Sequence, residues 1–175
     1  MSNFEDLLRK CKRQNPQAML KLYNICCQPV FNASLRIVMN EYDAEEIMQD
    51  SILKAFTLID RFIGTQKDFI ALVKKIAVNK SIDWYRKHSK EPLFTEIGNE
   101  TDDMSDDMEE ESCPIEMIME KMELLPDGYK MVLKLHLLDE LDFVDIAEMM
   151  NIKTSTVRSQ YVRALKKLRV YLIHN

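Results

Sequence analysis

A run of acidic residues divides this chain of 175 residues into two basic parts. Residues 92–120 hold 11 Asp and Glu and no Lys or Arg, a net charge of −11, whereas residues 1–91 carry +4 and residues 121–175 carry +2. Most of that run repels itself and has little to bury, so we expect a flexible acidic linker over 92–113. The alternative, an acidic helix face, lacks an apolar stripe beside the charges. Two small domains are therefore expected, over residues 1–91 and 114–175.

Composition favours helices in both domains. The chain has only 3 Gly and 5 Pro, and 46% of its residues are hydrophobic. Few residues therefore interrupt a helix, and the apolar fraction is sufficient for packed cores. The expected fold class is all-α, with two small helical domains.

The sequence also indicates a compartment. No apolar run approaches the roughly 20 residues that a helix needs to cross a bilayer, and residues 1–6 show neither the basic start nor the apolar stretch of a secretory signal. We therefore expect a cytoplasmic protein, in which thiols stay reduced. Buried free thiols are expected rather than a redox or metal site, because no C-x-x-C spacing connects Cys11, Cys26, Cys27 and Cys113.

Helical spacing predicts three helices after residue 14 in the first domain. Asn15 followed by Pro16 is typical of an N-cap and a first helical residue. Asp43 opens a second helix with a capping box, and this helix should end before Gly64. Asp68 is expected to cap the third helix, in which apolar residues recur at i, i+3, i+4, i+7 and i+8.

The second domain is expected to open with a helix near Pro114 that breaks at residues 126–128. A further helix follows over 129–138, and Asp142 caps a short helix that ends before residue 151.

Two short amphipathic helices with a tight turn indicate a helix-turn-helix. The turn is formed by residues 151–153, where Asn151 tolerates a left-handed backbone. Thr154 or Ser155 is expected to cap the last helix, which runs to about Tyr171. At about 100° per residue, its apolar face holds Val157, Tyr161, Ala164, Leu165 and Leu168, and its outward face holds Ser155, Arg158, Ser159, Val162, Arg163 and Lys166.

This outward face suits a DNA major groove. Arginine reads guanine edges, hydroxyl groups bind base or phosphate oxygens, and valine can meet a thymine methyl group. Residues 151–169 hold six basic residues and no acidic one. A merely solvated basic helix is the alternative, but it leaves the preceding capped helix and turn unexplained.

A second basic segment lies in the first domain. Residues 67–90 hold seven Lys and Arg and two Asp, interleaved with Phe69, Trp84 and Tyr85. Aromatic rings beside cations suit single-stranded nucleic acid, because bases stack on the rings while the cations follow the phosphates. Phe69 and Trp84 can equally be core residues.

Three stretches resemble one family. Residues 42–56 (YDAEEIMQDSILKAF) and 76–87 (IAVNKSIDWYRK) are similar to region 2 of bacterial sigma factors. Residues 145–159 (DIAEMMNIKTSTVRS) are similar to their region 4 helix-turn-helix. With only these two regions, the chain resembles the small extracytoplasmic-function group of the sigma-70 family, over residues 5–90 and 114–170.

The resemblance implies a dissociable RNA polymerase subunit that directs the core enzyme to promoters and helps to open the duplex. Such a protein has no catalytic residues, metal, cofactor or small-molecule substrate. It binds the β′ clamp helices and β flap of the core enzyme, and a possible further partner is an anti-sigma factor. The alternative from the residues alone is a helix-turn-helix regulator that binds duplex DNA without polymerase. An enzyme is disfavoured, since the three His are scattered and no phosphate loop or nucleophile constellation is present.

The resemblance also assigns residues. The β′ contact is expected from Glu46, Gln49, Asp50 and Lys54. Binding of the −10 element is expected from Phe62, Gly64, Thr65, Lys67, Phe69, Asn79, Lys80 and Arg86. The loop residues among them, with Asn79 and Lys80, are expected to hold a flipped base. The −35 contacts are expected from Thr154, Ser155, Thr156, Arg158, Ser159, Val162, Arg163 and Lys166. Asp83 is interpreted as a structural partner of a neighbouring cation.

Two positions depart from the family. Ser155 replaces the usual Gly, and Gln160 replaces a common basic residue. We place Gln160 at the flank of the groove-facing side, so a lost phosphate contact should weaken −35 affinity.

The linker has an expected role in this arrangement. Its 22 residues reach at most about 75 Å, at ~3.4 Å per residue, which is enough to join two promoter elements about two turns of B-DNA apart. Its acidic charges are expected to repel DNA and to keep the free protein off promoters.

Overall fold

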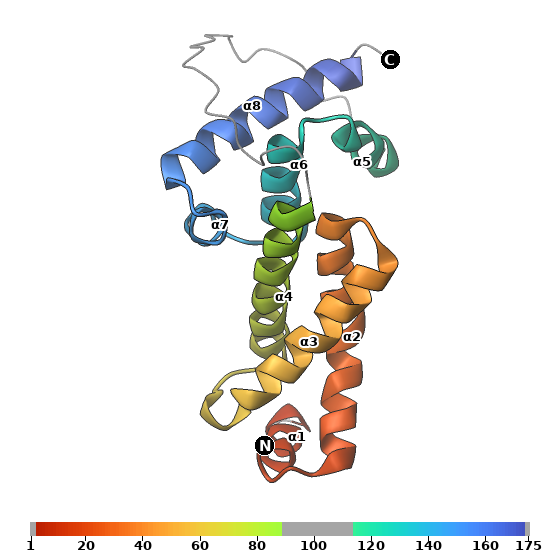
Figure 1. Cartoon of the computed structure of the whole chain (residues 1–175), viewed down its shortest axis with the longest axis vertical. Helices are drawn as coiled ribbons and strands as arrows, with labels where there is room; N and C mark the ends of the chain where they lie inside the picture. Colours follow the sequence, from red (N-terminus) through yellow and green to blue (C-terminus); the bar gives the residue numbers. More distant parts are fainter. Residues whose placement is uncertain (1–2, 89–113, 174–175) are drawn as a thin grey trace. The chain divides into compact units, whose positions relative to one another are not determined.

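The structure is a computed structural model that describes residues 3–88 and 114–173. Within these ranges the chain is helical and contains no strand, which confirms the all-α prediction. The chain divides into two compact units, Met1–Ser89 and Lys90–Asn175 (Figure 1). The predicted linker over 92–113, with Cys113 at its end, lies outside the described residues.

The first unit is built around three long helices. α2, α3 and α4 pack against one another, and α1 contacts α2 and the short helix η1 (Figure 1). The bounds are α1 Asn3–Lys12, α2 Pro16–Val38, α3 Glu41–Thr57, η1 Ile59–Arg61 and α4 Gln66–His88. α1 is absent from the helices expected above, although Phe4, Leu7, Leu8 and Cys11 recur at helical spacing and are buried.

The cap of α2 is as predicted, and that of α3 is not. Asn15 Oδ1 accepts a hydrogen bond of 2.9 Å from the Ala18 amide, and Pro16 is the first residue of α2. α3 begins two residues before Asp43, because Asn40 is its N-cap and accepts a 3.0 Å hydrogen bond from the Asp43 amide. The predicted capping box at Asp43 is therefore wrong. The end of α3 before Gly64 is confirmed.

In the second unit, α8 is the longest helix and contacts α5, α6 and α7 (Figure 1). The bounds are α5 Ile115–Glu123, α6 Asp127–Leu133, the π-helical turn η2 Lys134–Leu138, α7 Phe143–Met150 and α8 Thr154–Ile173. α5 ends at Glu123 and α6 begins at Asp127, so the break covers residues 124–126, two residues earlier than predicted.

An ion pair between the exposed Glu123 and the buried Lys134 joins α5 to the end of α6. Lys134 is 4% exposed, and its Nζ lies 2.7 Å from Glu123 Oε1; Lys130 Nζ lies 3.5 Å from the other carboxylate oxygen. Burial alone would raise the pKa of Glu123, but the hydrogen bond from Lys134 and the charges of both lysines hold that pKa below its ordinary value. The carboxylate thus supplies the countercharge that a buried ammonium requires.

Candidate nucleic-acid interface

The helix-turn-helix is formed by α7, its turn and α8. Asp142 caps α7 as predicted, since its Oδ1 accepts a 2.7 Å hydrogen bond from the Asp145 amide. Asn151 follows α7 in the left-handed region, with φ 52°, which confirms the prediction for the turn. The Ile152 amide donates to the Ala147 carbonyl at 3.0 Å, so the end of α7 is closed before α8 begins.

The start of α8 differs from the prediction. The helix begins at Thr154, and the Lys153 carbonyl accepts hydrogen bonds from the Thr156 and Val157 amides at 2.9 and 3.2 Å. Neither Thr154 nor Ser155 is therefore the capping residue. The hydrogen bond of the Ile152 amide ends α7, so only Lys153 lies between Ile152 and Thr154, the first residue of α8.

The faces of α8 follow the predicted division. Val157, Ala164 and Leu168 are buried, and Tyr161 and Leu165 pack partly against the core. The outward residues Ser155, Arg158, Ser159, Val162 and Lys166 are exposed, whereas Thr154, Thr156 and Arg163 are half-buried. The Ser159 hydroxyl donates to the Ser155 carbonyl at 3.0 Å, and its oxygen can still accept a hydrogen bond.

The prediction for Gln160 is wrong. This residue is 7% exposed, and its Oε1 has no hydrogen-bond partner among the described residues. It lies three residues after Val157 and four before Ala164, so all three share the buried face of α8. Gln160 therefore affects the core of the second unit and not a phosphate contact.

Replacing Gln160 by Met is expected to stabilise the second unit by about 1 kcal/mol, because a buried side chain whose amide oxygen has no hydrogen-bond partner among the described residues is exchanged for an apolar one of similar size. Hydrogen-exchange mass spectrometry on peptides from α6 to α8 measures the change, with the exposed Ser159→Ala as control. The affinity of Gln160→Met for duplex DNA should stay equal to that of the parent. A loss of stability in Gln160→Met would show that the amide is paired.

Three rings tie α8 to the preceding elements. His136 of η2 stacks on Phe143 of α7 with centroids 4.4 Å apart, and meets the edge of Tyr161 of α8 at 5.0 Å. Its Nδ1 lies 2.8 Å from the Leu141 carbonyl oxygen. The packing fixes α8 relative to α7.

In the first unit, the loop after η1 is built on a buried ring. Phe62 meets the edge of Phe69 with centroids 5.0 Å apart and planes at 84°. Phe69 has no exposed surface. Its ring therefore packs beneath Phe62 in the core and is not accessible to DNA. A Cβ on Gly64 would lie 3.1 Å from Phe62 Cζ and 3.0 Å from Asp68 Cβ. A larger residue would therefore push the Phe62 ring away.

The far side of the loop is closed by a capping box. Asp68 Oδ2 accepts hydrogen bonds from the Thr65 amide at 2.8 Å and the Thr65 hydroxyl at 2.7 Å, and the Asp68 amide donates to Thr65 Oγ1 at 3.3 Å. Asp68 is therefore the third helical residue, and the prediction that it is the N-cap is wrong. The hydrogen bonds from Thr65 hold the pKa of Asp68 below its ordinary value.

The predicted −10 residues do not form one cluster. Asn79 lies 14 residues beyond Thr65 on α4, or about 20 Å at 1.5 Å per residue. One base cannot contact both, whereas a strand along α4 can meet them in turn. Asn79 and the exposed Lys67 have side chains open to solvent.

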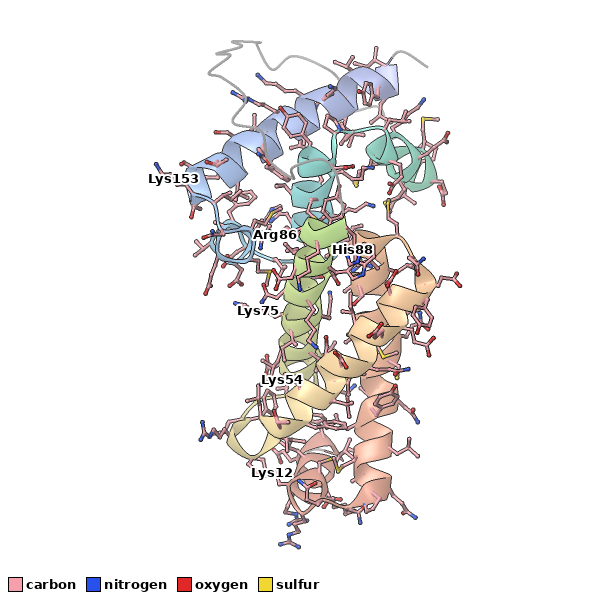
Figure 2. The ribbon with its side chains drawn as sticks, in the orientation of Figure 1. Lys12, Lys54, Lys75, Arg86, His88 and Lys153 are labelled. Atoms are coloured by element: carbon pink, nitrogen blue, oxygen red, sulfur yellow. The ribbon has the colours of Figure 1, made fainter. Side chains whose placement is uncertain are left out.

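Two predicted −10 cations are ion-paired. Lys80 Nζ lies 2.8 Å from Asp50 Oδ2 of α3, across an open groove between the two helices. Arg86 lies 3.2 Å from Asp83, one turn earlier, which agrees with the structural role expected for Asp83. Figure 2 shows Arg86 and His88 near the end of α4, where His88 stacks on the half-buried Trp84.

The residues predicted to bind polymerase share one exposed face of α3. Glu46, Gln49, Asp50 and Lys54 are all exposed, and Lys54 is labelled in Figure 2. Leu53 lies among them at helical spacing and is 58% exposed. Leu53 was not among the predicted residues, which were all polar or charged. The signal that identifies Leu53 is an apolar residue on the outward side of a capped helix.

The remaining chemistry is sparse. In the described part of the chain, no three His, Cys, Asp or Glu side chains are grouped to hold a metal ion, and no helix has the length and apolarity to cross a membrane. Cys11 and Cys26 are buried as predicted, and burial raises the pKa of Cys26 to about 12.

These features define a class: a DNA-binding protein with a helix-turn-helix in one unit and a basic helical bundle in the other. The family model "Sigma-70 region 2" matches residues 22–91, and "Sigma-70, region 4" matches residues 115–168. The chain belongs to the sigma-70 family, in its extracytoplasmic-function group. Its function is that of a sigma factor, which directs RNA polymerase to promoters for transcription initiation.

Several known proteins are similar to this chain. The chain is 28% identical to the ECF RNA polymerase sigma factor SigW of Bacillus subtilis, with 94% of each covered. It is 25% identical to the ECF RNA polymerase sigma-E factor of Escherichia coli, with 70% of each covered. A solved structure of CnrH in complex with the cytosolic domain of CnrY shares the fold, with a TM-score of 0.57 and 17% identity over 99% of each chain. Since both regions match, the alternative of a helix-turn-helix regulator without polymerase is not supported.

Proposed function

We propose that the two units divide promoter recognition between them: the second reads the −35 duplex and the first binds core polymerase and the opened −10 strand. The observation that carries this proposal is the outward face of α8, where Arg158, Ser159, Val162 and Lys166 are exposed. Behind them, α8 is held by its buried face and by the ring cluster at its N-terminal half. A rigid helix with such a face suits the major groove.

For the −10 element, the proposed contacts follow the geometry of α4. In the loop from Phe62 to Thr65, the first residue packs on Phe69 and the last is hydrogen-bonded to Asp68. The loop therefore offers a preformed surface to an unpaired base. Asn79, Lys80 and Arg86 would meet the strand farther along. In the free protein Lys80 and Arg86 are held by carboxylates, and phosphates would compete with these exposed pairs at little cost.

The exposed face of α3 is proposed to bind the β′ clamp helices. Gln49 donates to Glu45 at 3.1 Å, so part of the face is already ordered, and Leu53 gives it an apolar centre ringed by polar groups. Such an arrangement is typical of an interface hot spot. The second unit is proposed to meet the β flap.

Regulation by a protein partner is also proposed. In the solved structure that shares this fold, CnrH is bound to the cytosolic domain of CnrY, and we propose that an anti-sigma factor similarly restrains this chain. The protein would act in the cytoplasm with core polymerase. It would supply binding and no catalysis, and would need no metal, cofactor or small-molecule substrate.

Replacing Leu53 by Asp is expected to weaken binding to core polymerase at least about tenfold, because it places a charge at the centre of the proposed contact. Fluorescence anisotropy of the labelled full-length protein titrated with core enzyme measures the change. The matched control is Leu20→Asp, since Leu20 is 60% exposed on α2 of the same unit. Equal affinity of both variants and the parent would contradict the assignment of α3.

A further inference from the structure

We propose that Lys12, at the end of α1, is a positioning residue for the −10 loop: its ammonium holds the Phe62 carbonyl and so fixes the Phe62–Thr65 segment that receives the unpaired base. This inference rests on the proposed function of the loop. It assigns a role to α1, a helix that precedes the matched region 2.

The contact joins residues 50 positions apart. Lys12 Nζ donates a hydrogen bond of 2.9 Å to the Phe62 carbonyl oxygen. α1 is seated on the first unit by buried Phe4, Leu7, Leu8 and Cys11 and contacts η1 directly. Figure 2 shows Lys12 at the same end of the first unit as the segment between α3 and α4. The donor is thus carried by a packed helix and not by a mobile tail.

Lys12 differs from its basic neighbours in α1. Arg9 and Lys10 both pair with Asp6 within the helix, at 2.6 and 2.7 Å. Lys12 instead directs its charge to a neutral carbonyl in another element. A charge-assisted hydrogen bond of this kind is stronger than a neutral one, so it is well suited to restrain a loop.

The other restraints on the loop act on its two ends, Phe62 and Thr65, and not on the peptide group between Phe62 and Ile63. The Phe62 amide donates to the Ile59 carbonyl at 3.1 Å, and Thr65 is fixed by Asp68. Between these anchors the Ile63 side chain is 92% exposed and projects into solvent. The Phe62 carbonyl belongs to the peptide group that leads into Ile63, so the Lys12 hydrogen bond fixes the base of the projecting residue.

The functional consequence is preorganisation. A loop that is ordered before DNA arrives does not lose affinity to ordering on binding. Lys12 would therefore strengthen capture of an unpaired base without touching it. A direct contact between the ammonium and a phosphate is the competing role, and it predicts a different salt dependence.

The test uses the full-length protein with core polymerase and a promoter carrying 2-aminopurine in the −10 element. Lys12→Met keeps the aliphatic stem and removes the donor, and Lys12→Arg restores a donor and the charge. Lys10→Met is the matched control. We expect Lys12→Met to lower the equilibrium constant for −10 opening about five- to tenfold, to speed amide hydrogen exchange in residues 62–65, and to leave the salt dependence unchanged. Lys12→Arg should recover most of both effects.

Three outcomes would overturn the inference. Unchanged loop exchange and opening in Lys12→Met would show that the hydrogen bond restrains nothing. A smaller salt dependence with unchanged loop exchange would show a direct phosphate contact. If the loop exchanges faster but opening stays the same, and Ile63→Asp also opens normally, the −10 role of the loop is wrong, and the inference falls with it.

Discussion

Replacing Arg158 by Ala is expected to reduce promoter-specific initiation by roughly 5- to 150-fold, which corresponds to about 1 to 3 kcal/mol for a base-reading arginine. Arg158 is exposed in the first turns of α8, where a helix seated in the major groove meets base edges. The loss should be confined to promoters with a matching −35 base. Run-off transcription with core polymerase measures it, and anisotropy with a −35 duplex measures binding alone.

Lys167→Ala is the control, because this exposed lysine lies about 180° around α8 from Arg158, at 100° per residue. Its removal should change initiation little and equally at all promoters. Arg163→Ala and Lys166→Ala should each weaken −35 binding as well. If Arg158→Ala, Arg163→Ala and Lys166→Ala all initiate like the parent, the assigned face of α8 is mistaken.

Replacing Phe69 by Ala is expected to destabilise the first unit by about 3 to 5 kcal/mol, because the ring is fully buried and the cavity left behind cannot fill. This is a large share of the 5 to 15 kcal/mol typical of a domain. Urea unfolding followed by tryptophan fluorescence measures the change in this unit, since Trp84 is the only tryptophan in the chain.

The exposed Ile63 provides the control for Phe69. Ile63→Ala should change the free energy of unfolding by less than about 0.5 kcal/mol. If Phe69→Ala unfolds like the parent and yet loses −10 binding, Phe69 contacts DNA directly, and its placement beneath Phe62 is wrong.

The helix-turn-helix was the part most open to prediction. The faces of α8 depend on rotation along one helix, so spacing alone separates Val157 and Ala164 from Arg158 and Lys166. The cap at Asp142 and the left-handed turn at Asn151 were equally predictable, because both are local features of the chain. Gln160 lies at the boundary between the two faces of α8, where spacing does not decide whether a side chain is covered, and the packing of α8 buries it.

Other features depend on contacts that no local pattern contains. Asn40 and Asp43 are both good caps. α2 ends at Val38 with Met39 as its C-cap, so the next residue, Asn40, is the one that caps α3. The Lys80–Asp50 ion pair joins residues 30 positions apart, and the Lys12 hydrogen bond joins residues 50 apart. The sequence identifies Lys80 as a cation near DNA but not the carboxylate that holds it. α1 was predictable from its apolar spacing, and its role in supporting the loop was not.

The most direct test of the account is run-off transcription by purified core RNA polymerase, with and without the full-length protein, on templates that carry its −10 and −35 elements. We expect discrete transcripts only when the protein is present, and their loss when either element is scrambled. If the protein neither binds core enzyme nor changes where it initiates, with no inhibitor present, it does not act as a sigma factor.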